Sequence, residues 1–538
     1  MKKIALLVLV TLALLCTTGA LALLYNNHAS VNMPEEAPSV LMSEALQATT
    51  MSEEDPFATI GEDFLVVGKE SYAPVLYILF DNTHIYIDIE DDGVWEEHIV
   101  RNAGSSYTVS IPTRTILYGT RIHTDKPVIY WQRLSSHAYD VIPPIGALRT
   151  SYYVYGGTWY VVVPENTTIN VDNNDDGTID SSINATPLTR HSISASNFAR
   201  VFADKPFYLY CSYTLATQSG TDFYLPWNKI YRLIVTENNT LLKVDIDNDG
   251  HYDEEHTLNK GVVTNFAGFT FNHGAHIWTD KPVAIFSGRY WSSWWDHYWT
   301  PYRVLPSNMI GNDMWSPGSG SYYYITGFFK EDTGLYSNTT YYIDKVTDND
   351  LVPDATDVVN ANQYKSLPSL GMIHIWGNMP LYESYRYGSN IYGTIPYSSI
   401  TATTHGTQKV LGANESTEIY VRVFNPFATT TANNLSITVP IPKNFSLPDG
   451  SSLTLNIEKR LLRNDTVIIN DTIVVSPTNT GENFVFTITK TNTSLLCSLE
   501  PMTYYDIRYQ VITPPEYGSY RFEPVSLSFD AETWNMPQ

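Results

Sequence analysis

One short stretch of sequence recurs four times along the chain and decides its fold. It reads RIHTDKPVIYW at 121–131, RVFADKPFYLY at 200–210, HIWTDKPVAIF at 276–286 and HIWGNMPLYES at 374–384. The copies hold β-branched and aromatic residues around a shared proline, at Pro127, Pro206, Pro282 and Pro380. Such residues favour half-buried strands, and a pattern that recurs along a chain indicates a repeated structural unit.

An acidic segment precedes every copy of this stretch. It reads YIDIEDDGVWEE from Tyr86, NVDNNDDGTIDSS from Asn170, KVDIDNDGHYDEE from Lys243 and YIDKVTDNDLVPD from Tyr342. The first unit resembles the third most closely, and the fourth is the most diverged, as a terminal repeat often is. Together the two patterns predict four β repeats with boundaries at 64–150, 151–224, 225–317 and 318–402.

The residue pattern of the sequence changes from about residue 405. Segments such as TEIYVRVFNP and NLSITVPIP alternate apolar and polar residues, with turn residues between them. This period predicts one seven-stranded Ig-like β-sandwich over 405–538. The fold class is therefore all-β, with the four repeats forming either a β-propeller or tandem β-sandwiches.

Composition and charge exclude several classes of protein. The chain has 538 residues and a formal net charge of -24, so phosphate groups would be repelled and nucleic acid is not expected as a partner. Its three cysteines, Cys16, Cys211 and Cys497, are too far apart to form a disulfide framework or a metal–thiolate motif.

The first residues indicate export. Lys2 and Lys3 precede an apolar run, and Ala20-Leu21-Ala22 is a small-x-small cleavage sequence. Residues 1–25 are therefore expected to be a signal peptide or, if uncleaved, an N-terminal membrane anchor, which would be the only contact with a membrane. Residues 26–63 are acidic and poor in aromatics, which predicts a flexible linker. The expected location is extracellular or on the cell surface.

Glycosylation sequons support the same location. Asn-x-Ser/Thr occurs ten times, and the pattern is typical of surface loops in exported proteins. The acceptors are Asn166, Asn184, Asn238, Asn338, Asn414, Asn434, Asn444, Asn464, Asn470 and Asn492.

The acidic segments are candidate metal sites. Oxygen side chains at alternate positions of a tight, Gly-containing loop can converge on one centre, and such a cage suits Ca²⁺ in a structural role. An ion-free acidic hairpin turn is the competing interpretation, because Asp-Gly is also a strong turn signal. The candidate ligands are Asp88, Glu90, Asp92 and Glu96; Asp172, Asn174, Asp176 and Asp180; Asp245, Asp247, Asp249 and Asp253; and, without the glycine, Asp344, Asp348, Asp350 and Asp354.

An aromatic cluster is the second candidate site. The segment SGRYWSSWWDHYWTPYR at 287–303 holds seven aromatic rings that could stack on sugars or anchor a protein partner, or could pack together as a local core. The residues expected to bind are Tyr290, Trp291, Trp294, Trp295 and Trp299.

Motifs of catalysis are missing from the sequence. It holds no Gly-x-Ser-x-Gly elbow, no His-Glu-x-x-His and no phosphate-binding loop, so the chain is not expected to be an enzyme. His123, His276 and His374 are expected to be structural residues of the repeats.

The repeats resemble the β-rich N-terminal domain of IgG-Fc-binding protein and its prokaryotic surface relatives. The residues that carry this resemblance are the acidic hairpins, the turns Arg101–Gly104 and Leu258–Gly261, and Gly-x-x-Ile-x-x-Asp-Lys-Pro-Val at 119–128 and 274–283. Residues 405–538 look like the Ig-like domains of archaeal surface-layer and adhesin-like proteins. Both resemblances imply an extracellular structural or adhesive role, with other cell-surface proteins, glycans or further copies of the chain as partners.

Overall fold

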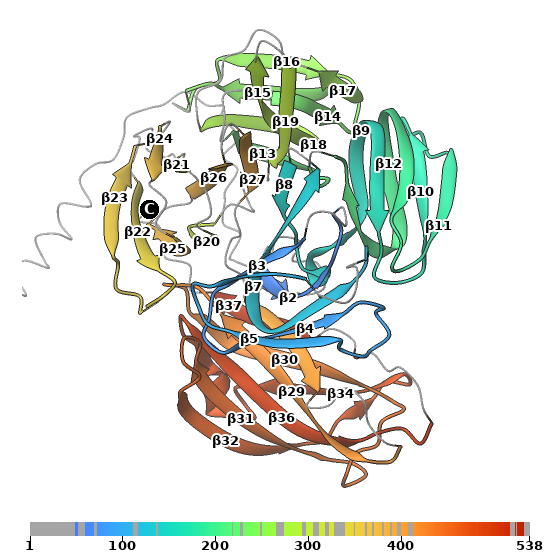
Figure 1. Cartoon of the computed structure of the whole chain (residues 1–538), viewed down its shortest axis with the longest axis vertical. Helices are drawn as coiled ribbons and strands as arrows, with labels where there is room; N and C mark the ends of the chain where they lie inside the picture. Colours follow the sequence, from blue (N-terminus) through green and yellow to red (C-terminus); the bar gives the residue numbers. More distant parts are fainter. Residues whose placement is uncertain are drawn as a thin grey trace, which may run out of the picture. The chain divides into compact units, whose positions relative to one another are not determined.

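The structure is a computed structural model, and its described part is built from β-strands (Figure 1). Besides strands, the described residues include two short 3-10 turns, η1 (Ile145–Ala147) and η3 (Ser494–Cys497). Within the described segments, no helix has the length and apolar character needed to cross a bilayer. The predicted leader, 1–25, lies outside the described residues, which are 49–51, 60–68, 73–110, 117–135, 138–212, 214–217, 219–225, 230–247, 250–264, 274–292, 297–304, 311–317, 322–327, 339–348, 350–360, 363–367, 371–378, 381–387, 390–394, 400–406, 413–516, 522 and 525–531.

The first and third repeats have the same strand order. Each forms a seven-stranded antiparallel sheet, β5-β4-β7-β3-β6 and β16-β15-β18-β14-β17, with two further strands on the central one. That central strand is the recurring stretch of the sequence. The strands are β2 (Ile60–Leu65), β3 (Val75–Ile78), β4 (Thr83–Asp88), β5 (Glu97–Arg101), β6 (Ser106–Thr108), β7 (Arg121–Ser135) and β8 (Ala138–Val141), then β13 (Ser219–Leu225), β14 (Ile230–Val235), β15 (Thr240–Asp245), β16 (Glu254–Leu258), β17 (Gly261–Thr264), β18 (Ala275–Ser292) and β19 (His297–Val304).

The second and fourth repeats keep the same core arrangement. In the second, the acidic hairpin pairs with the strand that carries the recurring stretch, in the order β11-β10-β12-β9. In the fourth, the stretch is divided between two sheets: its first part lies in β25 of the sheet β23-β22-β25-β20, where it pairs with the acidic hairpin, and its last part lies in β26 of the sheet β24-β21-β26-β27. The strands are β9 (Arg149–Val162), β10 (Thr167–Asn173), β11 (Ser181–Ala185) and β12 (His191–Tyr210), then β20 (Asp313–Ser316), β21 (Tyr322–Gly327), β22 (Thr339–Lys345), β23 (Ala355–Val359), β24 (Tyr364–Leu367), β25 (Ile373–Gly377), β26 (Leu381–Tyr387) and β27 (Asn390–Thr394).

The C-terminal residues form a five-stranded sheet, β28-β29-β36-β31-β32, and a six-stranded sheet, which together hold more strands than the seven predicted. The six-stranded sheet includes β1 (Thr49–Met51), which pairs with β37 and lies inside the predicted linker 26–63. The other strands are β28 (Thr401–Gly406), β29 (Ser416–Asn425), β30 (Ala432–Pro442), β31 (Leu453–Leu461), β32 (Val467–Val475), β33 (Thr478–Asn479), β34 (Asn483–Thr489), β35 (Ser498–Leu499), β36 (Thr503–Ile512) and β37 (Ser526–Ala531).

The hydrophobic cores cross the repeat boundaries that the sequence suggested. One core joins Ile129 and Trp131 of the first repeat to Trp315 of β20, and to Phe424 and Tyr504 of the C-terminal sheets. Strand β20 falls inside the predicted third repeat, 225–317, but pairs with β25 of the fourth. Other cores join the first repeat to the second and the second to the third. Burial of apolar surface is the main stabilising contribution to folding, so these units stabilise one another.

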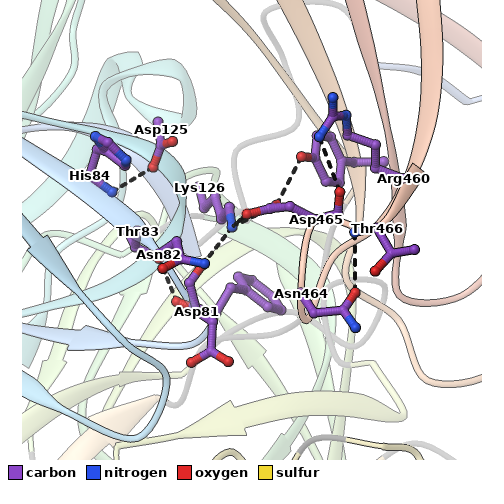
Figure 2. Close-up of polar contacts among 12 residues, drawn as sticks. Asp81, Asn82, Thr83, His84, Asp125, Lys126, Arg460, Asn464, Asp465 and Thr466 are labelled. Atoms are coloured by element: carbon purple, nitrogen blue, oxygen red, sulfur yellow. Dashed lines mark hydrogen bonds and ion pairs between the residues drawn. The ribbon is translucent and has the colours of Figure 1, made fainter.

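Polar contacts also fix the C-terminal sheets to the first repeat (Figure 2). The ammonium of Lys126, whose side chain is 2% exposed, lies 2.8 Å from the Asp465 carboxylate and donates to the Asp81 carbonyl oxygen at 2.5 Å. Tyr504 donates to the same Asp465 carboxylate at 2.9 Å. Nearby, Arg422 donates to Asp125 at 2.9 Å. Charged groups at this depth require such partners, so the junction is specific.

A recurring turn of one repeat contacts the acidic loop of another. Lys260, in the turn of the third repeat, forms an ion pair with Asp175 of the second at 2.9 Å. The corresponding turn of the first repeat places Gly104 against Thr347 of the fourth, where an added Cβ would lie 2.6 Å from the threonine Cγ2. The first and fourth repeats therefore meet through the same pair of elements as the third and second.

Candidate metal centres in the acidic hairpins

Each acidic loop joins two strands of one hairpin, and its first aspartate is buried in the sheet. The exposed fractions of Asp88, Asp172, Asp245 and Asp344 are 1%, 3%, 1% and 0%. Each of these aspartates lies opposite a basic residue of the central strand, in the pairs Asp88–Arg121, Asp172–Arg200, Asp245–His276 and Asp344–His374.

Sequence reasoning named His276 and His374 as structural residues but connected none of these four residues with the acidic loops. Three of them bind a second carboxylate: Arg121 lies 3.3 Å from Asp63, His276 lies 2.9 Å from Asp222, and His374 lies 2.8 Å from Asp313. Arg200 instead donates to Ser151 at 3.1 Å. Their common position, six residues before the shared proline, was the available signal. It places an arginine or a histidine opposite the first aspartate of every acidic loop.

Backbone hydrogen bonds shape the loops. In the first, the Asp88 carboxylate accepts from the amides of Asp92 and Gly93 at 3.1 and 2.9 Å, and Glu96 accepts from the Ile89 amide at 2.7 Å. The second loop repeats this pattern from Asp172 to Asp180. Aspartates that accept from backbone amides stabilise turns without an ion, which agrees with the turn interpretation of the sequence.

Three of the loops nonetheless gather carboxylates at one point. Ligand oxygens lie within 4.8 Å of one another in the triads Asp88–Asp92–Glu96, Asp245–Asp247–Asp253 and Asp344–Asp348–Asp354. The predicted ligands Glu90 and Asp350 are not in these triads, and Asp249 lies outside the described residues.

The second loop forms no such triad from its acids, all of which are described. Asn174 stands at one of its alternate positions, and Asp175 is paired with the Lys260 ammonium of the third repeat. The first and fourth loops also have a basic neighbour, Arg121 at 3.7 Å from Asp91 and Lys345 at 3.2 Å from Asp354, so the missing triad is what makes the second loop a comparison for the other three.

The fourth loop has the strongest electrostatic demand for a cation. Asp344 is fully buried, and its Oδ2 accepts from the Leu351 amide at 3.0 Å, while its Oδ1 has no hydrogen-bond partner among the described residues. Burial, together with the charges of Asp348 and Asp350, raises the pKa of Asp344 to about 6. A buried carboxylate oxygen without a donor is costly, and a bound cation would remove that cost.

The aromatic cluster is only partly described. Strands β18 and β19 pair so that Tyr290 lies opposite Trp299 and Trp291 opposite Tyr298. Trp294 and Trp295 lie outside the described residues. The hairpin thus brings predicted binding residues to adjacent strands.

The glycosylation acceptors lie at the surface wherever they are described. Nine of the ten asparagines are exposed, and the tenth, Asn338, lies outside the described residues. Attachment of a glycan requires such exposure.

Comparison with known proteins yields no relative from which a function can be transferred. No protein-family model and no curated protein matches the chain. Among solved structures, the VP2 subviral particle of infectious bursal disease virus is 10% identical, covering 59% of this chain and 72% of that chain with a TM-score of 0.14. A Corynebacterium diphtheriae protein described as membrane anchored is 8% identical, covering 85% and 92% with a TM-score of 0.15. The tandem CBM22 domains of Paenibacillus barcinonensis Xyn10C are 8% identical, covering 58% and 98% with a TM-score of 0.13. Likenesses this weak carry no argument about function.

Proposed function

We propose that this chain is an exported, extracellular or cell-surface structural or adhesion protein that acts by binding, and whose β repeats are stiffened by calcium at the acidic hairpins. The convergence of three carboxylates within 4.8 Å in three hairpins is the observation that carries the calcium proposal. Carboxylates this close repel one another unless a cation or water separates them, and Ca²⁺ accepts such oxygen cages.

The proposed architecture is a propeller-like arrangement of the four repeats followed by an Ig-like sandwich. Its support is the contact of Gly104 with Thr347, which has the same form as the contact of Lys260 with Asp175. A chain whose first and last repeats meet in this way leaves fewer strand edges exposed. Export is supported by the leader sequence and by nine exposed sequons.

Thermal unfolding with and without calcium tests the calcium proposal. Excess Ca²⁺ should raise the Tm by a few degrees, and EDTA should lower it to the same extent, because a ligand that binds the folded state stabilises it. Asp354→Asn, in the fourth hairpin, should reduce this shift. Asp176→Asn is the matched control, because the second hairpin has no triad, and it should leave the shift unchanged. A Tm indifferent to both EDTA and Ca²⁺ would exclude calcium stiffening.

A second proposal is carbohydrate binding by the aromatic hairpin. Its support is the pairing of Tyr290 with Trp299 and of Trp291 with Tyr298 on adjacent strands, because sugar-binding sites often present neighbouring rings. A glycan array with the chain and its Trp294→Ala/Trp295→Ala double variant tests it. Equal binding by both proteins would exclude this site.

A further inference from the structure

Two histidines of the first repeat converge on one point at the surface. His84 of β4 and His98 of β5 lie on the two arms of the first acidic hairpin, and His84 Nδ1 is 3.0 Å from His98 Nε2. Their rings stack at 5.1 Å, and the Tyr86 ring stacks on His98 at 4.5 Å. His98 is exposed and His84 is half-buried, so solvent reaches the pair.

The geometry fits a transition metal. With metal–nitrogen bonds of about 2.0–2.1 Å, two nitrogens 3.0 Å apart subtend an angle of about 95° at the metal. That angle is close to the right angle of square-planar and octahedral ions such as Ni²⁺ and Cu²⁺, which bind imidazole well. A tetrahedral ion would require a separation of about 3.3–3.4 Å, so Zn²⁺ would have to spread the rings.

The pair is specific to the first repeat. The Tyr86–His98 pair corresponds to Asn170–Ser182 in the second repeat, Lys243–Glu255 in the third and Tyr342–Thr356 in the fourth. The hairpin framework does not require imidazoles, because the other three repeats form the same pairing without them.

The charges around the pair are compatible with a bound dication. The Asp125 carboxylate accepts from the His84 amide at 2.7 Å and balances the Arg422 guanidinium beside it. The Tyr86 hydroxyl lies 3.5 Å from His84 Nδ1. Water would complete the coordination of a metal.

We propose that His84 and His98 form a transition-metal site for Ni²⁺ or Cu²⁺, which clamps the two arms of the first acidic hairpin. Metal binding would replace the hydrogen bond between the two rings: His84 Nδ1 and His98 Nε2 would bind the ion, and the ring hydrogens would lie on His84 Nε2 and His98 Nδ1. The Asp125 contact places the clamp beside the junction with the C-terminal sheets, as Figure 2 shows for His84 and Asp125.

Calorimetric titration with Ni²⁺ tests this site. The titration uses the full chain without a polyhistidine tag. Excess Ca²⁺ is added to occupy or screen the acidic loops, which makes the result independent of the calcium proposal. One equivalent of Ni²⁺ should bind, and His84→Gln and His98→Gln should each weaken binding roughly tenfold or more, since even loss of an outer-shell partner typically costs 10–100-fold. His256→Gln, in the corresponding hairpin of the third repeat, should leave the Kd unchanged.

Cu²⁺ provides a spectroscopic readout that folding defects do not imitate. The electron paramagnetic resonance spectrum of the wild-type chain should show two nitrogen ligands, and that of His98→Gln should show fewer. A His98→Gln chain that binds Ni²⁺ within twofold of the wild-type Kd would overturn the site. Equal weakening by His256→Gln would overturn it as well, because binding would then be distributed over surface histidines.

Discussion

At the scale of the residue, Arg121 shows how a basic side chain neutralises nearby carboxylates. Its guanidinium lies 3.3 Å from Asp63 and 3.7 Å from Asp91, so it links the acidic loop to a neighbouring strand. Burial of Asp63 opposes ionisation, but the positive charges of Arg121 and His123 lower the pKa of Asp63 well below its usual range. The protein therefore gains stability from keeping this aspartate ionised.

Asp63→Asn should remove that gain in a pH-dependent way. A carboxyl whose pKa is lower in the folded state stabilises the fold fully above its ordinary pKa of about 4. This contribution declines below that pH and is lost only as the pH passes through the lowered folded-state pKa. The variant should lose about 1 kcal/mol of unfolding free energy at pH 7, a value reduced for partial exposure, and a smaller amount at pH 3. Urea denaturation at both pH values measures the difference. An equal loss at pH 3 would indicate a packing defect instead of a lost ion pair.

The clustering of the acidic side chains could be predicted from the sequence, but the basic residues opposite them could not. Asp88, Asp92 and Glu96 lie four residues apart within one loop, so a single segment of sequence predicts that they are close together. Arg121 belongs to a strand more than thirty residues later, and the equivalent position is arginine in two repeats and histidine in two. The position six residues before the shared proline marks these residues as equivalent, but only the register of the sheet shows that they lie opposite the acidic loops.

At the scale of the element, the hairpins and central strands follow the sequence closely, since period, turn residues and register all act locally. The turn Arg101–Gly104 of the first repeat contacts a segment that is distant in sequence. Gly104 has a φ of +77°, and an added Cβ would meet Thr347 of the fourth repeat. A substitution at Gly104 therefore tests the contact between the first and fourth repeats.

Gly104→Ala should destabilise the protein more than Gly177→Ala does. Gly177 has a similar φ of +90° but open space around its Cβ position, so both changes carry the left-handed backbone penalty of about 1–2 kcal/mol. Gly104→Ala should cost about 1 kcal/mol more, because Thr347 must leave its rotamer. Chemical denaturation of both variants gives the comparison, and Thr347→Ser should relieve the excess. Equal losses in the two alanine variants would argue against the contact.

At the scale of the whole molecule, the all-β class was predicted correctly, whereas the sharing of cores was not. The similarity of the segments indicates repeats, but no sequence pattern indicates that Trp131, Trp315 and Tyr504 pack in one core. Strand Thr49–Met51 was likewise predicted as linker, since three residues are too few for a periodic signal and its partner β37 lies at the other end of the chain.

Lys126 and Asp465, at the junction between the first repeat and the C-terminal sheets, should be energetically coupled. Asp465→Asn leaves the Lys126 ammonium without its counter-charge in a buried position, and should cost about 3–5 kcal/mol. Lys126→Met together with Asp465→Asn should cost much less than the sum of the single changes, because no uncompensated charge remains. A double-mutant cycle by denaturation measures this coupling. Additive losses would show that the two side chains do not interact.

The core shared by residues near 129, 315 and 504 also determines when folding can finish. During synthesis the first repeat emerges hundreds of residues before Phe424 and Tyr504, which complete its packing. Native contacts with such large sequence separation form slowly, and the early segments keep apolar surface exposed until the end of the chain is available. Ribosome-bound fragments should thus stay protease-sensitive until the last strands are made.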